Sequence, residues 1–517
     1  MKNKYYITTP IYYVNDIPHI GHAYTSIIAD VYARFMRLLG KEVIFLTGTD
    51  EHGQKVEKAA SSAGILPQEF VDKIASSFIK LSIDLNLSNN DFIRTTEIRH
   101  VKAVQKFWNI LNQRGDIYLG KYCGWYSIKD EAFYSEAELT ADGKAPTGTE
   151  VEWVEESSYF FTLSKWQQKL LHWYENNDNI IKPAFFRNEV INFIKNGLTD
   201  LSISRTTFKW GIAVPNDPLH VIYVWLDALV NYVSALEYAS DNSTLMANFW
   251  PANLHIVGKD ILRFHAVYWP AFLMSADLPL PKTILVHGWW TNEGQKISKS
   301  VGNVINPVDL VNKFGVDQVR YFLLKEITVG KDGNFSQSGF INRINSELCN
   351  KLGNLVHRTL SFIYKYNKAK IPLLDEINII DLYKSEPLLI NTVTLSNSLV
   401  SLINNENITI ILSKIMEIVN QANMYFDQQA PWKFKDSNAQ KVAKILYTLI
   451  ETIRGIAILL QPFIPESASK ILDLIAVDKT ERKFNYIDSS YALKPGKVIS
   501  EPIPIFVKIE EKSNNIC

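Results

Sequence analysis

The order of apolar and polar residues near the N-terminus predicts a β-strand, a helix and a second strand. Tyr5–Thr9 is a short apolar run typical of a buried strand, and a polar turn follows it. Apolar side chains then recur at helical spacing, at Ala23, Ile27, Ile28, Val31, Phe35 and Leu39. Gly40 stands where a C-cap glycine is expected, and 43–46 is a second apolar run. Such a unit predicts parallel strands joined by a right-handed crossover.

Three later apolar runs predict that the same parallel sheet continues. We expect strands at 220–224, 255–257 and 284–286, a helix at 225–233 and another helix within 258–272. Between the two parts of the sheet, residues 118–208 carry aromatic side chains, acidic runs and turns at Gly143 and Pro146. This irregular pattern predicts an inserted β-rich subdomain.

The second half of the chain has the apolar periodicity of successive helices. Helix-length segments extend from 341 to about 474, with breaks at 404–407 and Pro431, and they predict an antiparallel helix bundle. We expect the tail to fold back, with a short strand in EPIPIFVKI at 501–509.

Composition excludes several classes of protein. Lys+Arg and Asp+Glu both number 54, so an RNA partner would need a local basic surface rather than a general basic coat. The three cysteines are widely spaced, which suits a reducing cytoplasm and offers no disulfide framework. The N-terminus lacks a signal-peptide pattern, and no uninterrupted apolar run approaches the ~20 residues that cross a bilayer. We therefore expect a cytoplasmic protein without a membrane partner.

Two histidines stand at the expected start of the first helix. Pro18 suits the first helical position, and His19 and His22 are three residues apart, so they share one face. A helix N-terminus attracts anions, and two imidazoles there could hydrogen-bond phosphate oxygens. The same H-x-x-H spacing also occurs in metal sites and on plain surfaces. Far downstream, Lys296 and Lys299 follow a turn at Gly294, where lysines are usually only solvated.

Together, HIGH at 19–22 and KISKS at 296–300 resemble the paired motifs of class I aminoacyl-tRNA synthetases. ITTPIYYVN before HIGH, GTDEHG at 48–53 and YVWLDAL at 223–229 resemble methionyl-tRNA synthetases, over nearly the whole chain. The resemblance implies an α/β fold: a Rossmann-like parallel-sheet catalytic domain with a β-rich insertion, followed by an α-helical anticodon-binding bundle. The implied domains are 1–117 and 209–316 (the halves of the catalytic domain), 118–208 (the insertion), 317–340 (a connector), 341–474 (the anticodon-binding domain) and 475–517 (a C-terminal tail).

The resemblance also implies the reaction and its residues. L-Methionine would be activated with ATP and Mg²⁺ to methionyl-adenylate and transferred to tRNA(Met) for translation elongation and initiation. His19, His22, Lys296 and Lys299 would be catalytic, because adenylate formation is catalysed mostly by positioning and charge neutralisation. The implied ATP-binding residues are His19, Gly21, His22, Gly258, Asp260, Lys296, Ser298 and Lys299. The implied methionine-binding residues are Ile11, Tyr13, Asp50, Trp225, Ala228, Leu229, Tyr232, Ile261 and His265.

Anticodon recognition is assigned by the family to residues of the helix bundle. Asn350, Asn354 and Arg358 recur every four residues, which places them on one helix face. Pro431 breaks a helix before Trp432, so the indole can project for stacking on a base. These five residues are the expected anticodon-binding set.

Two features of the family are absent from the pattern. The insertion often holds a zinc knuckle, but here it contains only Cys123 and His172, too few for a tetrahedral zinc site, so we expect no metal. The chain resembles a short form without the C-terminal dimerisation domain, so we expect a monomer.

Three other classes of protein fit the sequence less well. Isoleucyl, valyl and leucyl enzymes carry long editing insertions, and cysteinyl enzymes need zinc-binding cysteines; the sequence has neither. Small HIGH-type nucleotidyltransferases would lack the helix bundle. A non-catalytic tRNA-binding relative would not need both phosphate motifs.

Overall fold

The computed structural model describes residues 3–14, 17–129, 132–134, 136–297, 302–374, 378–405 and 408–510. The chain forms two compact units, which are described separately here. The first comprises Met1–Ala29, Val43–Ile83 and Leu87–Gly288, and the second comprises Asp30–Glu42, Asp84–Asn86 and Trp289–Cys517.

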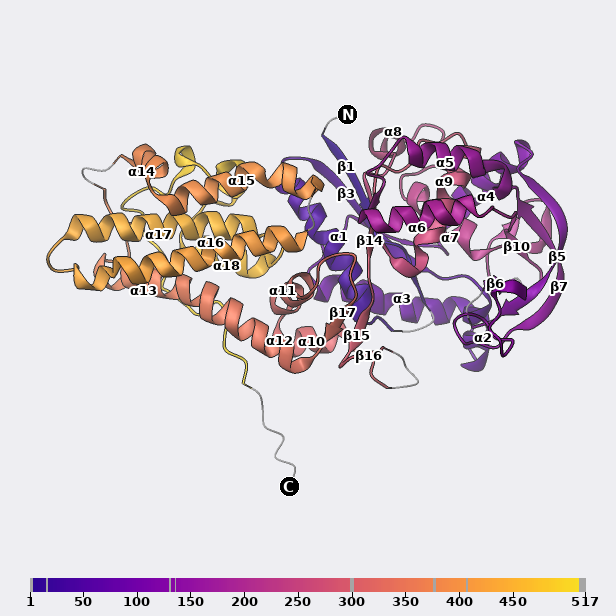
Figure 1. The fold of residues 1–517 in the computed structure, drawn as a ribbon, viewed down its shortest axis with the longest axis horizontal. Helices are drawn as coiled ribbons and strands as arrows, with labels where there is room; N and C mark the ends of the chain where they lie inside the picture. Colours follow the sequence, from indigo (N-terminus) through magenta and orange to yellow (C-terminus); the bar gives the residue numbers. More distant parts are fainter. Residues whose placement is uncertain are drawn as a thin grey trace, which may run out of the picture. The chain divides into compact units, whose positions relative to one another are not determined.

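A seven-stranded sheet forms the centre of the first unit. Its order is β2-β3-β1-β13-β14-β8, with β4 paired to β3. Figure 1 labels β1, β3 and β14 of this sheet. The strands are β1 (Lys4–Thr8), β2 (Tyr12–Tyr13), β3 (Glu42–Asp50), β4 (Asp91–Arg94), β8 (Ile181–Lys182), β13 (Leu254–Gly258) and β14 (Ile284–His287). β1 pairs with β13 and β13 with β14 in parallel. Strands of a parallel sheet are covered on both faces, which explains their continuous apolar runs. The predicted strands at 255–257 and 284–286 are confirmed as parts of β13 and β14.

The predicted strand–helix–strand unit is present, but its helix begins later than predicted and its second strand is longer. Helix α1 (Ile20–Leu38) begins two residues after Pro18, and the amides of Gly40 and Lys41 bond to the carbonyls of Arg37 and Met36 as in a Schellman motif. The second strand, β3, is longer than predicted and runs through Asp50. The extension forms because Thr47 and Thr49 continue the ladder with β4.

The first unit also contains helices and an antiparallel insertion. The helices of the first unit after α1 are α2 (Gln54–Ser62), α3 (Pro67–Asp84), α4 (Ile98–Gln113), α5 (Gln167–Glu175), α6 (Ala184–Lys195), α7 (Val224–Ser234), α8 (Thr244–Phe249) and α9 (Trp269–Ser275). The insertion is the predicted β-rich subdomain. In it, β5 (Ile117–Ser127) pairs with β6 (Ala132–Tyr134) and β7 (Glu152–Phe161), and β7 pairs with β9 (Leu201–Ser202), all antiparallel.

The expectation of a parallel strand at 220–224 is wrong. β12 (Asp217–Ile222) belongs to a separate antiparallel sheet with β10 (Ser204–Arg205) and β11 (Ala213–Val214). A two-residue turn at Pro215 and Asn216, with φ 66° at Asn216, reverses the chain between β11 and β12. Such a hairpin forces antiparallel pairing.

The second unit is dominated by helices, as predicted. They are α10 (Pro307–Phe314), α11 (Val316–Glu326), α12 (Gln337–Arg343), α13 (Asn354–Tyr366), α14 (Ile379–Ser385), α15 (Pro387–Asn405), α16 (Ile408–Gln429), α17 (Ala439–Leu460) and α18 (Pro465–Leu474). A small sheet, β16-β15-β17, joins Gln295–Lys296, Trp290–Asn292 and Gly333–Phe335. α15 and α16 end at the two predicted breaks.

The tail folds back without the predicted strand. Residues 501–509 form no strand, and Pro502 and Pro504 lack the amide hydrogens that a ladder needs. Instead, the Asn345 amide bonds both backbone groups of Ile509 at 2.8 Å, and Phe506 is buried.

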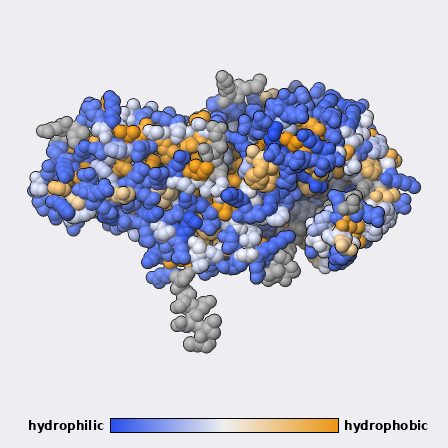
Figure 2. Space-filling model, viewed as in Figure 1, coloured by the Kyte–Doolittle hydropathy of each residue, from blue (hydrophilic) through white to orange (hydrophobic). Residues whose placement is uncertain are grey.

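The surface is polar on the side drawn in Figure 2, where hydrophilic residues cover most of the area and hydrophobic patches are small and scattered. Within the described part of the chain, no helix is both long enough and apolar enough to span a bilayer.

Candidate functional site

The two predicted phosphate-binding histidines cap the start of α1. The Gly21 amide donates to Nδ1 of His19, and the His19 amide donates to Nδ1 of His22, both at 3.1 Å. Their rings stack with centroids 3.8 Å apart, which confirms that they share one face. This reciprocal arrangement resembles a capping box built from imidazoles. Because each Nδ1 accepts an N–H, a neutral ring must carry its proton on Nε2.

Burial keeps both rings neutral near pH 7. It lowers the pKa of His19, against the opposing carboxylate of Asp260. Burial also lowers the pKa of His22 well below its ordinary value, and the neighbouring His19 adds to this shift. The site therefore offers two Nε2–H donors, groups of the kind that can hydrogen-bond a phosphate oxygen. Glycine is required at position 21, because an added Cβ would lie 2.9 Å from Cε1 of His19.

Gly258 and Asp260 lie at the carboxyl end of β13, the edge of the sheet where ligands bind in open α/β folds. A Cβ at Gly258 would approach Oδ1 of Asp260 to 2.5 Å, so only glycine accommodates this carboxylate. Sequence reasoning missed His287, which pairs with Gly258 in the sheet register and lies 2.8 Å from the Thr25 hydroxyl. Its position directly after the predicted strand 284–286 was the available signal.

The structure brings Tyr232, Ile261 and His265 together. The Nδ1–H of His265 donates to the Ile261 carbonyl at 3.0 Å, so its Nε2 accepts from the Tyr232 hydroxyl at 2.7 Å. Burial lowers the pKa of His265 to about 4, which keeps it neutral. Trp225 stacks on Phe264, an aromatic residue that sequence reasoning missed, with centroids 3.4 Å apart.

Helix α7 carries four of the expected methionine-binding residues, namely Trp225, Ala228, Leu229 and Tyr232. The last three are buried, whereas Trp225 is half-buried. Asp50 is buried at the end of β3 and pairs in register with Tyr13, and Ile11 packs on the main core.

A buried ionic network ties the end of β3 to α7. Asp227 of α7 accepts from Nδ1 of His52 and from Nε2 of His100, each at 2.7 Å. Burial opposes its charge, but the two histidines hold the pKa of Asp227 at about 2. The network fixes α7, with its pocket residues, against the strand that presents Asp50. Asp227 and His100 were not singled out from the sequence.

The lysine motif lies in the second unit. Lys296 is exposed on β16, directly after the turn at Gly294 (φ 78°), with its ammonium 5.8 Å from the Trp289 ring. Ser298 and Lys299 lie outside the described residues.

The expected anticodon residues gather on one side of the bundle. Arg358 of α13 binds Asp427 of α16 at 2.7 Å and lies 4.4 Å above the Phe426 ring. Trp432 packs against the same ring, at 5.8 Å, and is 42% exposed. Asn350 and Asn354 are exposed and Pro431 is buried. Asn350 lies in a π-helical segment, Ile344–Gly353, which a spacing of four does not predict. Phe426 and Asp427, which contact Arg358, were not singled out from the sequence.

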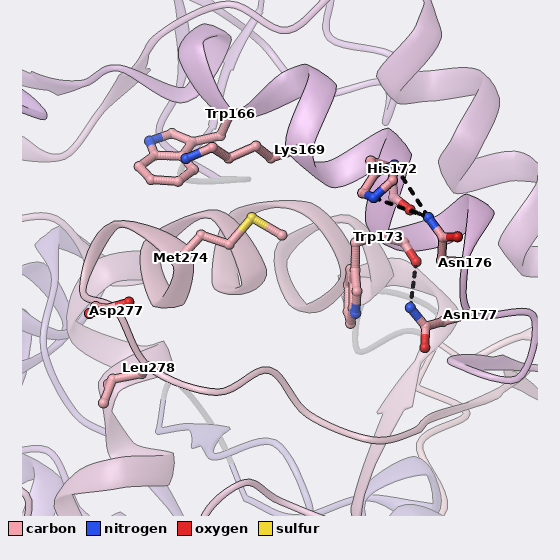
Figure 3. Close-up of a pocket in the computed structure, with 9 residues that line it drawn as sticks. All are labelled: Trp166, Lys169, His172, Trp173, Asn176, Asn177, Met274, Asp277 and Leu278. Atoms are coloured by element: carbon pink, nitrogen blue, oxygen red, sulfur yellow. Dashed lines mark hydrogen bonds between the residues drawn. The ribbon is translucent and has the colours of Figure 1, made fainter.

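A separate groove of about 470 Å³ lies between α5 and the end of α9 (Figure 3). Trp166, Lys169, His172, Trp173, Asn176, Asn177, Met274, Asp277 and Leu278 line it, and it contains none of the expected site residues. The Asn176 and Asn177 amides donate to the His172 and Trp173 carbonyls of their own helix, at 2.7 and 2.8 Å. They complete the C-terminal turn of α5 rather than present groups to a ligand.

In the described residues, no group of three or more His, Cys, Asp or Glu side chains is arranged to hold a metal ion. Cys123 is exposed on β5, with its thiol 3.4 Å from a Glu155 carboxylate oxygen.

Comparison with known proteins covers nearly the whole chain. The family described as tRNA synthetases class I (M) matches residues 5–152 and 139–360, and the anticodon binding domain of methionyl tRNA ligase matches 395–516. The chain is 59% identical to the methionine–tRNA ligase of Rickettsia felis, over 99% of each chain, and 50% identical to that of Rhizobium meliloti, over 98% of each. It is similar to Mycobacterium tuberculosis methionyl-tRNA synthetase in complex with methionyl-adenylate, with a TM-score of 0.94 and 44% identity, over 98% of this chain and 99% of the other.

Proposed function

The chain belongs to the class I methionyl-tRNA synthetases, the methionine–tRNA ligases, and on this premise we propose how its residues divide the reaction. ATP and L-methionine form methionyl-adenylate, and the methionyl group then passes to tRNA(Met) for elongation and initiation. The observation that carries the proposal is the histidine pair, whose Nδ1 atoms are occupied by backbone amides. The pair is thereby fixed as two neutral Nε2–H donors directed at phosphate.

In the first step, the methionine carboxylate attacks the α-phosphorus of ATP and pyrophosphate leaves. Catalysis of this kind rests on positioning and charge neutralisation. In this proposal, His19 and His22 bind oxygens of ATP, and Asp260 binds the ribose hydroxyls. Gly21 and Gly258, which have no side chain, let the nucleotide approach the main chain. Lys296, Ser298 and Lys299 bind the β- and γ-phosphates as negative charge builds on the leaving group.

Magnesium enters with ATP in this proposal. Mg²⁺ is commonly bound by substrate phosphates, water and one or two carboxylates rather than by a protein cage. Asp260, directly after the carboxyl end of β13, is a carboxylate that would fit this mode. The ion would supply further neutralisation of the phosphate oxygens.

The methionine pocket is proposed to use Asp50 for the ammonium group and aromatic walls for the thioether. Sulfur–aromatic contacts contribute about 0.3–1.5 kcal/mol, which suits Tyr13, Trp225 and Tyr232. Ile11, Ala228, Leu229, Ile261 and His265 complete the walls. Tyr232 and His265 are already held together by a hydrogen bond, so this side of the pocket is preorganised.

Selectivity is predicted to fall when a wall is trimmed. ATP–pyrophosphate exchange measured across the twenty amino acids should respond to methionine in the unmodified enzyme. Trp225→Ala and Tyr13→Ala should admit bulkier amino acids and lose discrimination by at least about 10-fold, the lower end of what a single methylene is worth in such a pocket. Trp153→Ala, which removes a 57% exposed indole, is the control. An unaltered preference in both pocket variants would refute the assignment, whereas exchange with a different amino acid in the unmodified enzyme would refute the function.

Anticodon reading is proposed for the bundle. Trp432 stacks on one base, supported by Pro431, while Asn350, Asn354 and Arg358 bond the edges of its neighbours. The Arg358–Asp427 pair is solvent-exposed and therefore contributes little stability. Arg358 can exchange this carboxylate for a base without a large cost.

Trp432→Ala is predicted to weaken tRNA(Met) charging by about ten- to hundredfold, because base–aromatic stacking is lost. ATP–pyrophosphate exchange with methionine should stay near normal, since the residue contacts no substrate of the first step. Both assays are run on the same variant. A parallel fall in both would make Trp432 a structural residue of the bundle, and unchanged charging would remove it from the RNA site.

We also propose that the enzyme folds and works without zinc, as a monomer in the cytoplasm. The support is the donor set of the insertion, where Cys123 is paired with a carboxylate and His172 lines the groove of α5. Metal analysis of purified protein should find no stoichiometric zinc, and activity should survive chelation once magnesium alone is restored. Zinc that is needed for folding or activity would contradict this prediction.

The roles that we propose follow the domain bounds expected from the sequence. Residues 1–117 and 209–316 bind ATP and methionine, 118–208 form the connective insertion, 317–340 connect the two functions, and 341–474 read the anticodon ahead of the tail at 475–517. The match of residues 395–516 to the anticodon binding domain of methionyl tRNA ligase supports the assignment of anticodon reading to the helices.

A further inference from the structure

The end of α13 carries exposed aromatic rings and lysines that the anticodon assignment does not use. We call Phe362, Lys365, Tyr366 and Lys435 the α13 patch. Tyr366 is 45% exposed and packs on Phe362, with ring centroids 4.6 Å apart. The ammonium groups of Lys365 and Lys435 lie 5.1 and 5.0 Å from the Tyr366 centroid. One ring therefore gathers two cations from segments about 70 residues apart in sequence.

The patch continues the surface that carries the proposed anticodon site. Asn354, Arg358, Phe362 and Tyr366 recur every four residues along α13 and so share a face. Arg358 contacts Phe426 and Asp427 of α16, and further along Tyr366 contacts Lys435, six residues beyond the end of α16. α13 and α16 thus run in the same direction, as alternate helices of an antiparallel bundle do. Arg358 and Tyr366 are separated by about 12 Å at 1.5 Å per residue.

Positive charge predominates on this surface. Residues 362–370 contain Lys365, Lys368 and Lys370 and no acidic residue, and 433–444 contain four lysines against Asp436. Lys444 is paired with Glu386 at 2.6 Å, which leaves three in that segment. In a chain whose basic and acidic residues balance at 54 each, this is a concentrated basic surface. Lysines interleaved with exposed rings fit a nucleic-acid strand, because the cations meet phosphates and the rings meet bases.

We propose that the α13 patch binds the backbone phosphates of the tRNA anticodon arm next to the triplet read by Trp432. Lys365 and Lys435 make the phosphate contacts, and Tyr366 holds both side chains through cation–π contacts. The inference rests on the proposed anticodon site, which it extends along α13. The α13 patch differs from the anticodon site in what it recognises, because phosphate contacts position the RNA and carry no sequence information.

The test is the doubly substituted enzyme Lys365→Gln/Lys435→Gln. Filter binding measures its Kd for tRNA(Met) and for a transcript with an altered anticodon, over a series of salt concentrations. Each lost phosphate contact should reduce the magnitude of the slope of log affinity against log salt by about 0.7–0.9. At physiological salt, this corresponds to a roughly fivefold loss of affinity for each contact. The loss should be equal for the two RNAs, while ATP–pyrophosphate exchange is unchanged.

Two further variants separate this inference from the proposed function. Lys470→Gln, which removes an exposed lysine from α18 of the same unit, should leave the slope unchanged. Trp432→Ala should reduce discrimination between the two RNAs but keep the slope; if discrimination is unaffected, the anticodon assignment alone fails. An unaltered slope in the double variant, or a loss confined to tRNA(Met), would overturn the role of the α13 patch.

Discussion

Replacing Lys299 with alanine is expected to slow methionyl-adenylate formation by about 100- to 1,000-fold, with little change in methionine affinity. Negative charge develops on the departing pyrophosphate only as the α-phosphorus is attacked, so an ammonium directed at it stabilises the transition state more than the ground state. Lys296, the first lysine of the motif, is exposed directly after the turn at Gly294, so its ammonium is accessible to a ligand.

Single-turnover kinetics with saturating ATP measures the rate, and methionine binding is measured separately on the same protein. Lys313→Ala, an exposed lysine on α10 of the same unit, is the matched control and should behave as the unmodified enzyme. Equal losses of rate and of methionine affinity in Lys299→Ala would mean that the lysine supports the ground state or the fold.

The second large effect is expected at His19, where two substitutions separate capping from catalysis. In His19→Asn, the side-chain oxygen can accept the Gly21 amide that Nδ1 now accepts, and asparagine is among the best N-cap residues. Its side chain is too short to place a donor where Nε2 lies. The variant should keep its melting temperature but lose about 100- to 1,000-fold in adenylate formation, the effect of removing one preorganised donor.

His19→Gln has the complementary change. Its amide extends to the position of Nε2 and retains a donor there, while the geometry of the N-cap is less favourable. We expect a slightly lower melting temperature and a rate closer to that of the unmodified enzyme. Because burial lowers the pKa of His19, neither substitution removes a positive charge at pH 7, and the comparison isolates hydrogen bonding.

Local patterns in the sequence predicted the parts of the fold that are fixed locally. The strand, α1 and the Gly40 cap follow from apolar spacing and one glycine, and the pairing of His19 with His22 follows from a spacing of three. The direction of β12 was missed because it depends on the turn at Pro215 and Asn216, which a search for apolar runs does not weigh. The length of β3 was missed because its last residues are polar and are held by β4.

Long-range contacts at the site could not be predicted from spacing. Asp227 meets His52 and His100, which are 175 and 127 residues away in sequence, and a lone buried Asp gives no local signal of its partners. Arg358 and Asp427 meet across two helices 69 residues apart. The motif alone predicted a phosphate-binding role for His19, whereas the tautomer of His19 follows only from the amide bonded to Nδ1.

The most direct test of the account is the rate of methionyl-adenylate formation in a single turnover, measured for His19→Asn and His19→Gln side by side. In the proposed mechanism, the Nε2–H of His19 donates to phosphate and its Nδ1 caps the helix. This mechanism predicts that His19→Gln stays within about tenfold of the unmodified enzyme and that His19→Asn, although equally folded, is at least about tenfold slower than His19→Gln. A rate for His19→Asn that equals or exceeds that of His19→Gln would contradict it.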